Sequence, residues 1–310
     1  MTKLELIQNI EALKKERNAI ILAHYYTPDE VQEVADFVGD SLALSRVAAN
    51  NDADVILFAG VHFMAETAKV LSPQKTVLLP DLEAGCSLAD SCDATKFGEF
   101  VKKYPDHTVI SYVNTTVGVK AHTDIVCTSS NAISVVDSLP KDAKIIFGPD
   151  RNLGNYVKTS TGREDMIIWD GACHVHEQFS LERILELKEA NPDAKILTHP
   201  ECKKPIHLIS DVLGSTAELL EFAKTDSATK FIVVTEPGIL YKMKLECPGK
   251  EFIPAPPTDS TCGCNDCSYM KLNTLEKIYN TLKNNTNIIE IDEEMRQKAE
   301  KSILRMLEIG

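Results

Sequence analysis

Short runs of β-branched and other apolar residues recur along the chain, and each run ends in polar residues. The first kind of run lies at residues 18–26, 107–115 and 194–201. A second kind follows each of these after a helical pattern, at residues 54–60, 144–148 and 230–235. A third kind lies at residues 75–79 and 165–169, with a weaker counterpart at 251–253. Strands that are apolar throughout and alternate with helices indicate parallel sheets covered on both faces.

Polar residues at the strand ends repeat along the chain at intervals of 86 to 88 positions. Four features keep this period, which makes a chance alignment improbable. They are His24, Tyr112 and His199; Tyr26, Asn114 and Glu201; Ser41, Ser129 and Ser215; and the pair Cys86 and Cys173.

The repeat predicts an α/β protein with three similar units of roughly 85–90 residues. The expected organisation is an N-terminal surface helix at 1–17, units at 18–104, 105–190 and 191–270, and a helical segment at 271–310 that packs back on the body. Because ligands bind beyond the carboxyl ends of parallel strands, three units around a pseudo-threefold axis could direct these ends to one central cavity.

Composition excludes some classes of function. The net charge of −13 argues against a nucleic-acid-binding surface, which needs clustered Lys and Arg. No apolar run approaches the roughly 18 residues that cross a bilayer, and the N-terminus lacks the apolar centre of a signal peptide. We therefore expect a cytoplasmic protein.

The chain has nine cysteines, which in a reducing compartment are more often metal ligands or catalytic groups than disulfides. Cys127, Cys202 and Cys247 are interpreted as small buried residues. One thiolate from each unit would suit either zinc with a fourth ligand or a [4Fe–4S] cluster with one open iron. An open iron is a Lewis acid that can assist loss of water, but the spacing alone does not choose between the metals.

Serine and threonine open the predicted helices at Ser41, Ser129 and Ser215-Thr216. Free backbone N–H groups and the helix dipole at such positions favour phosphate or carboxylate. The alternative is an ordinary N-cap, which is the commonest use of these residues. Because three such positions lie near the strand ends, we expect at least one of them to bind substrate.

Taken together, these motifs resemble the quinolinate synthase family over nearly the whole chain. The motifs, in order, are Ala23-His24-Tyr25-Tyr26, Gly39-Asp40-Ser41-Leu42, Glu83-Ala84-Gly85-Cys86, Ser111-Tyr112-Val113-Asn114, Cys173-x-x-His176, His199-Pro200-Glu201, Gly214-Ser215-Thr216 and Cys267-x-Tyr269-Met270. The resemblance implies three three-layer α/β/α domains with pseudo-threefold symmetry and an active site at their interface. It also implies condensation of iminoaspartate with dihydroxyacetone phosphate to quinolinate, phosphate and two waters, in de novo NAD biosynthesis.

The resemblance also assigns roles to individual residues. The ligands of a [4Fe–4S] cluster would be Cys86, Cys173 and Cys267. Tyr26 and Glu201 would be the acid–base pair, with His176 beside them or facing the substrate. The residues expected to hold carboxylates and phosphate are His24, Ser41, Tyr112, Asn114, Ser129, His199, Ser215 and Thr216. Functional coupling to an aspartate-oxidising enzyme is also expected, because such an enzyme would supply unstable iminoaspartate.

Two observations give different positions for the third cysteine. The repeat favours a position near Cys262, whereas the family's Cys-x-aromatic-Met pattern selects Cys267, and we follow the local motif because loop insertions shift spacing cheaply. Cys262 and Cys264 would then be spectators or form a reversible disulfide. Two other functions fit the residues: an iron–sulfur hydro-lyase that dehydrates a small hydroxy acid, and a zinc-stabilised binding module without enzymatic activity.

Overall fold

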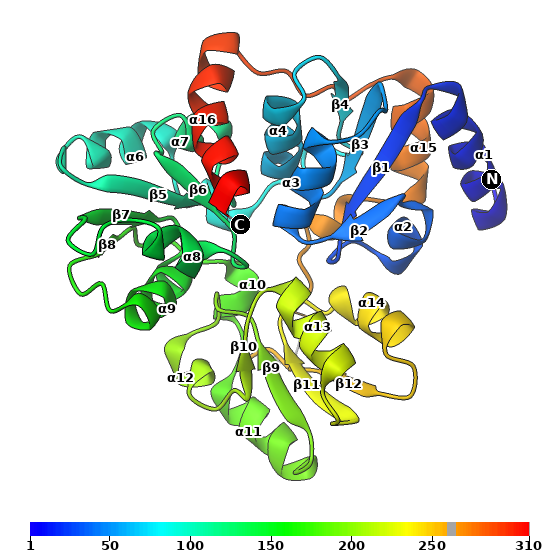
Figure 1. The fold of residues 1–310 in the computed structure, drawn as a ribbon. Coiled ribbons are helices and arrows are strands. Elements are labelled where there is room, and N and C mark those ends of the chain that lie inside the picture. The colour runs from blue at the N-terminus through cyan, green and yellow to red at the C-terminus, as the bar shows by residue number, and fades with distance from the viewer. Residues whose placement is uncertain (259–264, 310) are drawn as a thin grey trace.

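The computed structural model of the chain, described here for residues 1–258 and 265–309, contains three four-stranded parallel sheets (Figure 1). Their strand orders are β2-β1-β3-β4, β6-β5-β7-β8 and β10-β9-β11-β12. The strands of the first sheet are β1 Ala19–His24, β2 Phe37–Gly39, β3 Val55–Ala59 and β4 Thr76–Leu78. Those of the second are β5 Thr108–Tyr112, β6 Ile125–Cys127, β7 Ile145–Gly148 and β8 Ile167–Ile168. Those of the third are β9 Lys195–Thr198, β10 Val212–Leu213, β11 Lys230–Val234 and β12 Glu251–Pro254.

Helices connect the strands within each sheet. Around the first sheet they are α1 Lys3–Glu16, α2 Asp29–Val34, α3 Ser41–Ala49, α4 His62–Leu71 and α5 Ser87–Asp90. Around the second they are α6 Ala94–Val101, α7 Val117–Lys120, α8 Ala132–Asp137, α9 Arg151–Thr161 and α10 His174–Glu177. The remaining helices are α11 Leu181–Ala190, α12 Lys204–His207, α13 Thr216–Thr225, α14 Ile239–Glu246, the 3₁₀ turn Met270–Leu272, α15 Leu275–Asn284 and α16 Glu293–Ile309.

Each sheet is apolar on both faces, which confirms the three-layer α/β/α architecture. In β1, Leu22 enters one core while Ile21 enters the core on the opposite face. In β7, Phe147 and Ile146 likewise enter cores on opposite faces of the sheet. Neighbouring residues of β11 do the same. Alternation along a fully buried strand produces this pattern, because successive side chains point to opposite faces.

The period read from the motifs is also present in the hydrogen bonds. An aspartate after each of α2, α7 and α12 accepts the backbone N–H of the central strand, at 2.7 to 2.8 Å. These pairs are Asp36 with Ile21, Asp124 with Val109, and Asp211 with Ile196. The three units therefore share atomic detail as well as topology.

The two C-terminal helices pack on the rest of the protein. α15 lies against α1 and β3, while α16 buries Ala299, Ile303 and Met306 against β6, α7 and α4 (Figure 1). Figure 1 shows α16 standing between the first and second sheets. The predicted N-terminal helix is α1, which begins with a capping box between Thr2 and Glu5. α6 packs Phe97 on the second sheet, although the sequence analysis placed it in the first unit.

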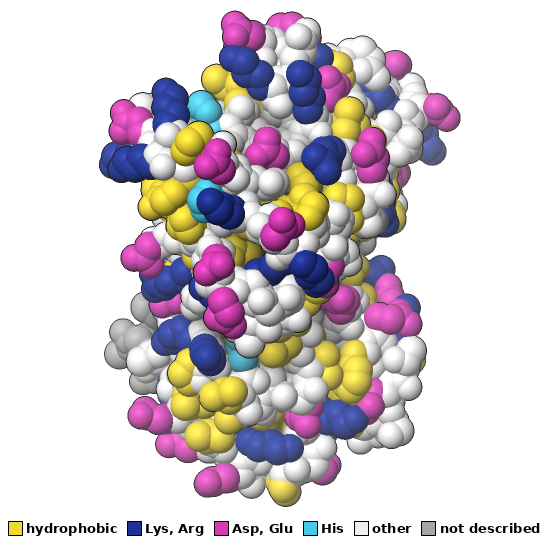
Figure 2. Space-filling model, turned by 60° about the vertical axis from the view of Figure 1, so that its left-hand side comes forward, with side chains coloured by type: hydrophobic (Ala, Val, Ile, Leu, Met, Phe, Trp, Pro, Cys, Tyr) yellow, Lys and Arg dark blue, Asp and Glu magenta, His cyan; other side chains and the backbone are white. Residues whose placement is uncertain are grey.

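Acidic and basic side chains are interspersed on the face shown in Figure 2, and hydrophobic side chains form small groups there. Among the described residues, no helix has the length and apolar character needed to cross a bilayer.

Candidate active site

A cavity lies where the three units meet, with about 700 Å³ of space between protein atoms, part of which is open to solvent. Residues after the carboxyl ends of strands in all three sheets line it. Every site residue predicted from the sequence is among them except Ser215: the lining includes His24, Tyr26, Ser41, Cys86, Tyr112, Asn114, Ser129, Cys173, His176, His199, Glu201, Thr216 and Cys267.

Two histidines of the cavity are held in one tautomer by their own turns. Nδ1 of His24 accepts the backbone N–H of Tyr26 at 3.2 Å, and Nδ1 of His199 accepts that of Glu201 at 3.3 Å. Burial lowers the pKa of each imidazole to about 3, so both rings are neutral near pH 7. The remaining proton then sits on Nε2, which in His199 lies 3.2 Å from the Ser129 hydroxyl.

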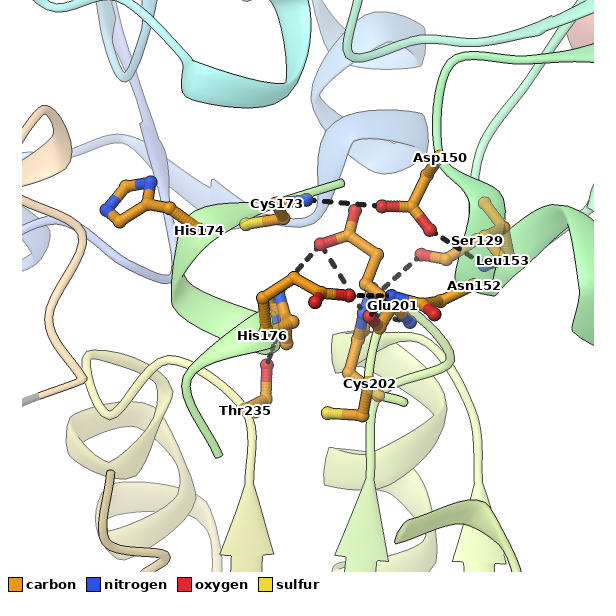
Figure 3. Close-up of polar contacts among 12 residues, drawn as sticks. Ser129, Asp150, Asn152, Leu153, Cys173, His174, His176, Glu201, Cys202 and Thr235 are labelled. Atoms are coloured by element: carbon orange, nitrogen blue, oxygen red, sulfur yellow. Dashed lines mark hydrogen bonds and ion pairs between the residues drawn. The ribbon is translucent and has the colours of Figure 1, made fainter. Parts of the chain in front are cut away.

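The Glu201 carboxylate lies beside a chain of polar groups that leads to Tyr26. Its Oε2 is 2.7 Å from Nδ1 of His176, whose Nε2 is 3.0 Å from the Thr235 hydroxyl. That hydroxyl is 2.7 Å from the phenol oxygen of Tyr26. Figure 3 shows Glu201, His176 and Thr235 approaching one another from different elements. These contacts join the turns after β1, β9 and β11 with α10.

The protonation states of Glu201 and Tyr26, at the two ends of this series of polar groups, follow from burial and from nearby charges. Burial by itself would raise the pKa of Glu201, but the adjacent His176 outweighs it and the pKa falls to about 2. Burial raises the pKa of Tyr26 well above its ordinary value, so the phenol keeps its proton. The site therefore holds a carboxylate and a protonated phenol, separated by an imidazole and a hydroxyl.

The three cavity cysteines occupy equivalent settings. Each precedes a short helical turn, α5, α10 or the turn Met270–Leu272, and backbone N–H groups of that turn face its sulfur. The donors are Ala89 and Leu88 for Cys86, His176 for Cys173, and Met270 and Tyr269 for Cys267. Such N–H groups stabilise a negatively charged sulfur.

Without a cation these thiols do not ionise readily. Burial raises the pKa of Cys86 to about 12 and that of Cys267 to about 11, and nearby negative groups raise both further. Burial raises the pKa of Cys173 as well, with added effects from Glu201 and the other two thiols. A bound metal centre would supply the missing positive charge, because ligation deprotonates a coordinating thiol. The donor set therefore fits a metal centre with three thiolate ligands.

Two buried carboxylates orient the second and third of these cysteines. Asp150 follows β7 and accepts the backbone N–H of Cys173 at 3.3 Å, as drawn in Figure 3. Glu236 follows β11 and accepts that of Cys267 at 3.1 Å. Lys271 pairs with Glu236 at 2.8 Å and also donates to the carbonyl of Tyr26, so it ties the third cysteine to the first unit.

The first two cysteines are tied together through the residues that follow them. The Ser87 hydroxyl lies 2.6 Å from Nδ1 of His174, and the backbone N–H of His174 donates to the same hydroxyl at 3.3 Å. Cys262 and Cys264 lie outside the described residues.

A second group of possible metal ligands overlaps the cysteine site. One ligand atom from each of Cys173, His176 and Glu201 lies within 4.8 Å of the other two. Glu201 and His176 already pair with each other, which favours an acid–base role for them over ligation.

The helix-opening serines differ from one another in the structure. Ser215 is a buried N-cap whose hydroxyl accepts the N–H of Glu218 at 3.3 Å, and its helix presents Thr216 to the cavity. Ser41 is the first residue of α3, which is capped by Asp40. The expected helix start at Ser129 is wrong: α8 begins at Ala132, because Asn131 folds back to accept the N–H of Thr128 at 2.7 Å.

Sequence reasoning missed several cavity residues and their supports, namely Asp40, Phe63, Met64, Asp150, Thr235 and Glu236. A signal existed for two of them, because Asp150 stands two residues after β7 and Glu236 stands two residues after the equivalent strand β11.

Comparisons with known proteins agree with this geometry. A family model described as "Quinolinate synthetase A protein" matches residues 8–308. Curated quinolinate synthases from Thermosynechococcus vestitus and Nostoc sp. are 56% and 54% identical over 307 residues. The alignments cover 99% of this chain and 96% and 94% of the two relatives.

A solved structure, the E-1-hydroxy-2-methyl-but-2-enyl-4-diphosphate reductase from Plasmodium falciparum, aligns over 91% of this chain and 94% of its own. Its 12% identity and TM-score of 0.33 are too low to support an argument. The family match and the curated relatives cover nearly all of the chain, and the chain therefore belongs to the quinolinate synthase family.

Proposed function

We propose that the protein is a quinolinate synthase that condenses iminoaspartate with dihydroxyacetone phosphate, giving quinolinate, phosphate and two waters. The observation that carries this proposal is a single cavity, shared by three units, that holds three thiols together with the polar chain from Glu201 to Tyr26. Membership of the family supplies the substrate class.

Both substrates are anions, yet the described residues that line the cavity include neither Lys nor Arg. Neutral donors must therefore hold the carboxylates and phosphate. Nε2–H groups of His24 and His199, the hydroxyls of Ser41, Ser129 and Thr216, and the amide of Asn114 are the donors we assign. The N-termini of α3 and α13 add the positive ends of their helix dipoles.

Proton transfers fall to the chain's own side chains. The Glu201 carboxylate accepts protons, the Tyr26 phenol donates them, and His176 with Thr235 keeps both groups aligned. Tyr112 stands near Glu201 and Ser129, where burial and Glu201 raise the pKa of its phenol, so it also acts as a donor.

We assign a [4Fe–4S] cluster to Cys86, Cys173 and Cys267. Three sulfurs, each facing backbone N–H groups and each from a separate unit, match three protein ligands of such a cluster, and the described part of the cavity lining offers no fourth thiol. When bound, such a cluster supplies a Lewis-acidic iron for the loss of water.

Cluster ligation is tested by anaerobic purification of single variants. Cys86→Ser, Cys173→Ser and Cys267→Ser should each lose the brown absorption near 400 nm and most of the iron and sulfide. Cys247→Ser is the matched control, since Cys247 is a buried cysteine at the end of α14 outside the cavity lining. Equal iron content in all four proteins would contradict the assignment, and stoichiometric zinc would favour the binding module.

The reaction is tested by product formation. Quinolinate and phosphate should appear only when iminoaspartate and dihydroxyacetone phosphate are both supplied. Dehydration of a single hydroxy acid, with no need for the phosphorylated substrate, would favour the hydro-lyase instead. A cytoplasmic location and coupling to an aspartate-oxidising enzyme stay predictions from the sequence.

A further inference from the structure

The turn that follows the first strand of each unit carries one cavity residue between two residues whose carbonyl groups face a side chain on a nearby short helix. The cavity residues are Tyr26, Asn114 and Glu201, at equivalent positions. Another residue keeps the same spacing in each unit. It stands eight positions after His24, Tyr112 and His199, and is Gln32, Lys120 and His207 respectively. These three, here called the anchor residues, lie on the equivalent short helices α2, α7 and α12.

In the first unit the anchor is an amide. Nε2 of Gln32 donates to the carbonyls of Tyr25 and Thr27, both at 2.9 Å, and these two residues flank Tyr26. It also approaches the carbonyl of Gly238 in the third unit at 3.1 Å. Gln32 is 5% exposed, so water does not compete for these acceptors.

In the second unit the anchor is a fully buried lysine, and burial lowers the pKa of its ammonium group to about 7. Nζ of Lys120 donates to the carbonyls of Val113 at 2.8 Å and of Thr115, which flank Asn114. It also lies 5.4 Å from the centre of the Phe63 ring. A buried ammonium group is costly unless its hydrogen bonds are made, and these carbonyls supply them.

In the third unit the contact is looser. The His207 ring approaches the carbonyls of Pro200 and Cys202, which flank Glu201, while its buried Nε2 makes no hydrogen bond of good geometry. Three different side chains therefore face the same pair of carbonyls.

We propose that Gln32 and Lys120 are positioning residues, which set the orientation of Tyr26 and Asn114 by holding the carbonyls of the residues on either side of each. The proposal deepens the function proposed above and rests on it. Its physical basis is that each peptide unit is planar and turns as one piece. The carbonyl of the preceding residue belongs to the peptide that leads into the cavity residue, and the carbonyl of the following residue belongs to the peptide one step beyond it. Holding both therefore restricts the backbone on either side of the cavity residue, and with it the direction of the side chain. An unpartnered buried carbonyl would instead favour rotation of that peptide toward another donor.

The test uses Lys120→Met in the cluster-loaded enzyme, alone and combined with Asn114→Ala. Lys120→Met removes the donors but keeps an apolar chain of similar length. We expect KM and the Kd for quinolinate, measured by calorimetry, to rise about tenfold, the size of one hydrogen bond to Asn114. In the Asn114→Ala background the same change should add little, because the group that Lys120 positions is already gone.

Lys188→Met is the matched control. Nζ of Lys188 also donates to two carbonyls, those of Pro192 and Ala194, but these lie before β9 at the opposite end of the strand. It should lower the melting temperature and leave KM and the Kd for quinolinate unchanged. Iron content is measured for every variant, so that loss of the cluster is recognised.

Two further variants cover the case in which Lys120→Met does not fold. Lys120→Gln restores an amide of the kind used in the first unit, and should recover affinity relative to Lys120→Met. Gln32→Met should lower kcat in the otherwise unchanged enzyme but not further in a Tyr26→Phe background.

Equal fold-changes in both backgrounds, or a rise in KM for Lys188→Met as large as for Lys120→Met, would overturn the positioning role. A wild-type enzyme that neither binds nor forms quinolinate would instead refute the proposed function.

Discussion

At the scale of single residues, the environment of Glu201 decides what the site can do. The side chain is almost completely buried, yet it sits between His176 and the neutral ring of His199. Nδ1 of His199 already accepts an N–H, so its 3.9 Å approach to Glu201 is not an ion pair. His176 is therefore the partner that keeps the carboxylate charged.

Glu201→Gln should keep the cluster and lose turnover. An amide cannot accept a proton, and general-base groups typically contribute about 10²- to 10⁴-fold to a rate. Quinolinate formation by the anaerobic variant is compared with its iron content. Glu251→Gln, at the start of β12, is the control and should retain full activity. A Glu201→Gln enzyme with normal kcat would remove this residue from the acid–base role.

Thr235→Val should lower kcat more than it raises KM. The substitution keeps the shape of the side chain but breaks the contacts to Tyr26 and His176, which then lose their shared partner. We expect a fall in kcat of about tenfold or more, since the two catalytic groups are no longer aligned. Steady-state kinetics compare it with Thr225→Val, an exposed position at the end of α13.

Residues at strand ends could be predicted from the sequence because the repeat marks them three times. Thr235 could not be, since its counterparts after β3 and β7 are different residues and no motif singles it out. Its role comes from the approach of Tyr26 and His176, 209 and 59 residues away in the chain. Such distant contacts leave no local pattern.

At the scale of elements, the two central strands of each sheet and the edge strands β4, β8 and β12 were predicted, and the opposite edge strands β2, β6 and β10 were not. β2, β6 and β10 are only 3, 3 and 2 residues long, and the sequence around them was not recognised as an apolar run. The short helices α2, α7 and α12 were not predicted either, although they carry the anchor residues. These short elements are held against the neighbouring strand by hydrogen bonds to the carboxylates of Asp36, Asp124 and Asp211.

Two adjacent residues at the start of α13 should separate capping from binding. Ser215→Ala removes the N-cap and should cost about 1 kcal/mol of the free energy of unfolding. Thr216→Ala should leave stability closer to normal but raise KM more, because Thr216 lines the cavity. Urea unfolding and kinetics of the two variants measure this difference, and a larger rise in KM for Ser215→Ala would reverse the assignment.

At the scale of the whole molecule, the three units meet through groups beside the cysteines. Ser87 with His174 joins the first two units, and Lys271 with Glu236 and the carbonyl of Tyr26 joins the third to the first. The repeat predicted that three units would share a cavity. It could not predict that α16 would fill the space between two of them, because the C-terminal helices have no counterpart in the repeat (Figure 1).

Removal of the cluster should therefore lower the melting temperature of the whole chain. A ligand bound only by the native state stabilises it, and the three cysteines that we assign to the cluster come from all three units. Differential scanning calorimetry under anaerobic conditions compares the loaded protein with protein stripped by oxidation and chelation. The shift should be absent in Cys173→Ser, which has no cluster to lose. Identical melting curves with and without iron would argue against a centre that joins the units.

The three units carry different side chains at one equivalent position: a tyrosine, an asparagine and a glutamate. This difference affects how a small molecule lies in the cavity. Were the same side chain present three times, a ligand at the centre could adopt three indistinguishable orientations related by 120° turns. Only one of them would place a given carboxylate beside the reacting partner. Because the chain presents a phenol, an amide and a carboxylate instead, each direction out of the centre is chemically different, and the ligand has a unique way to face.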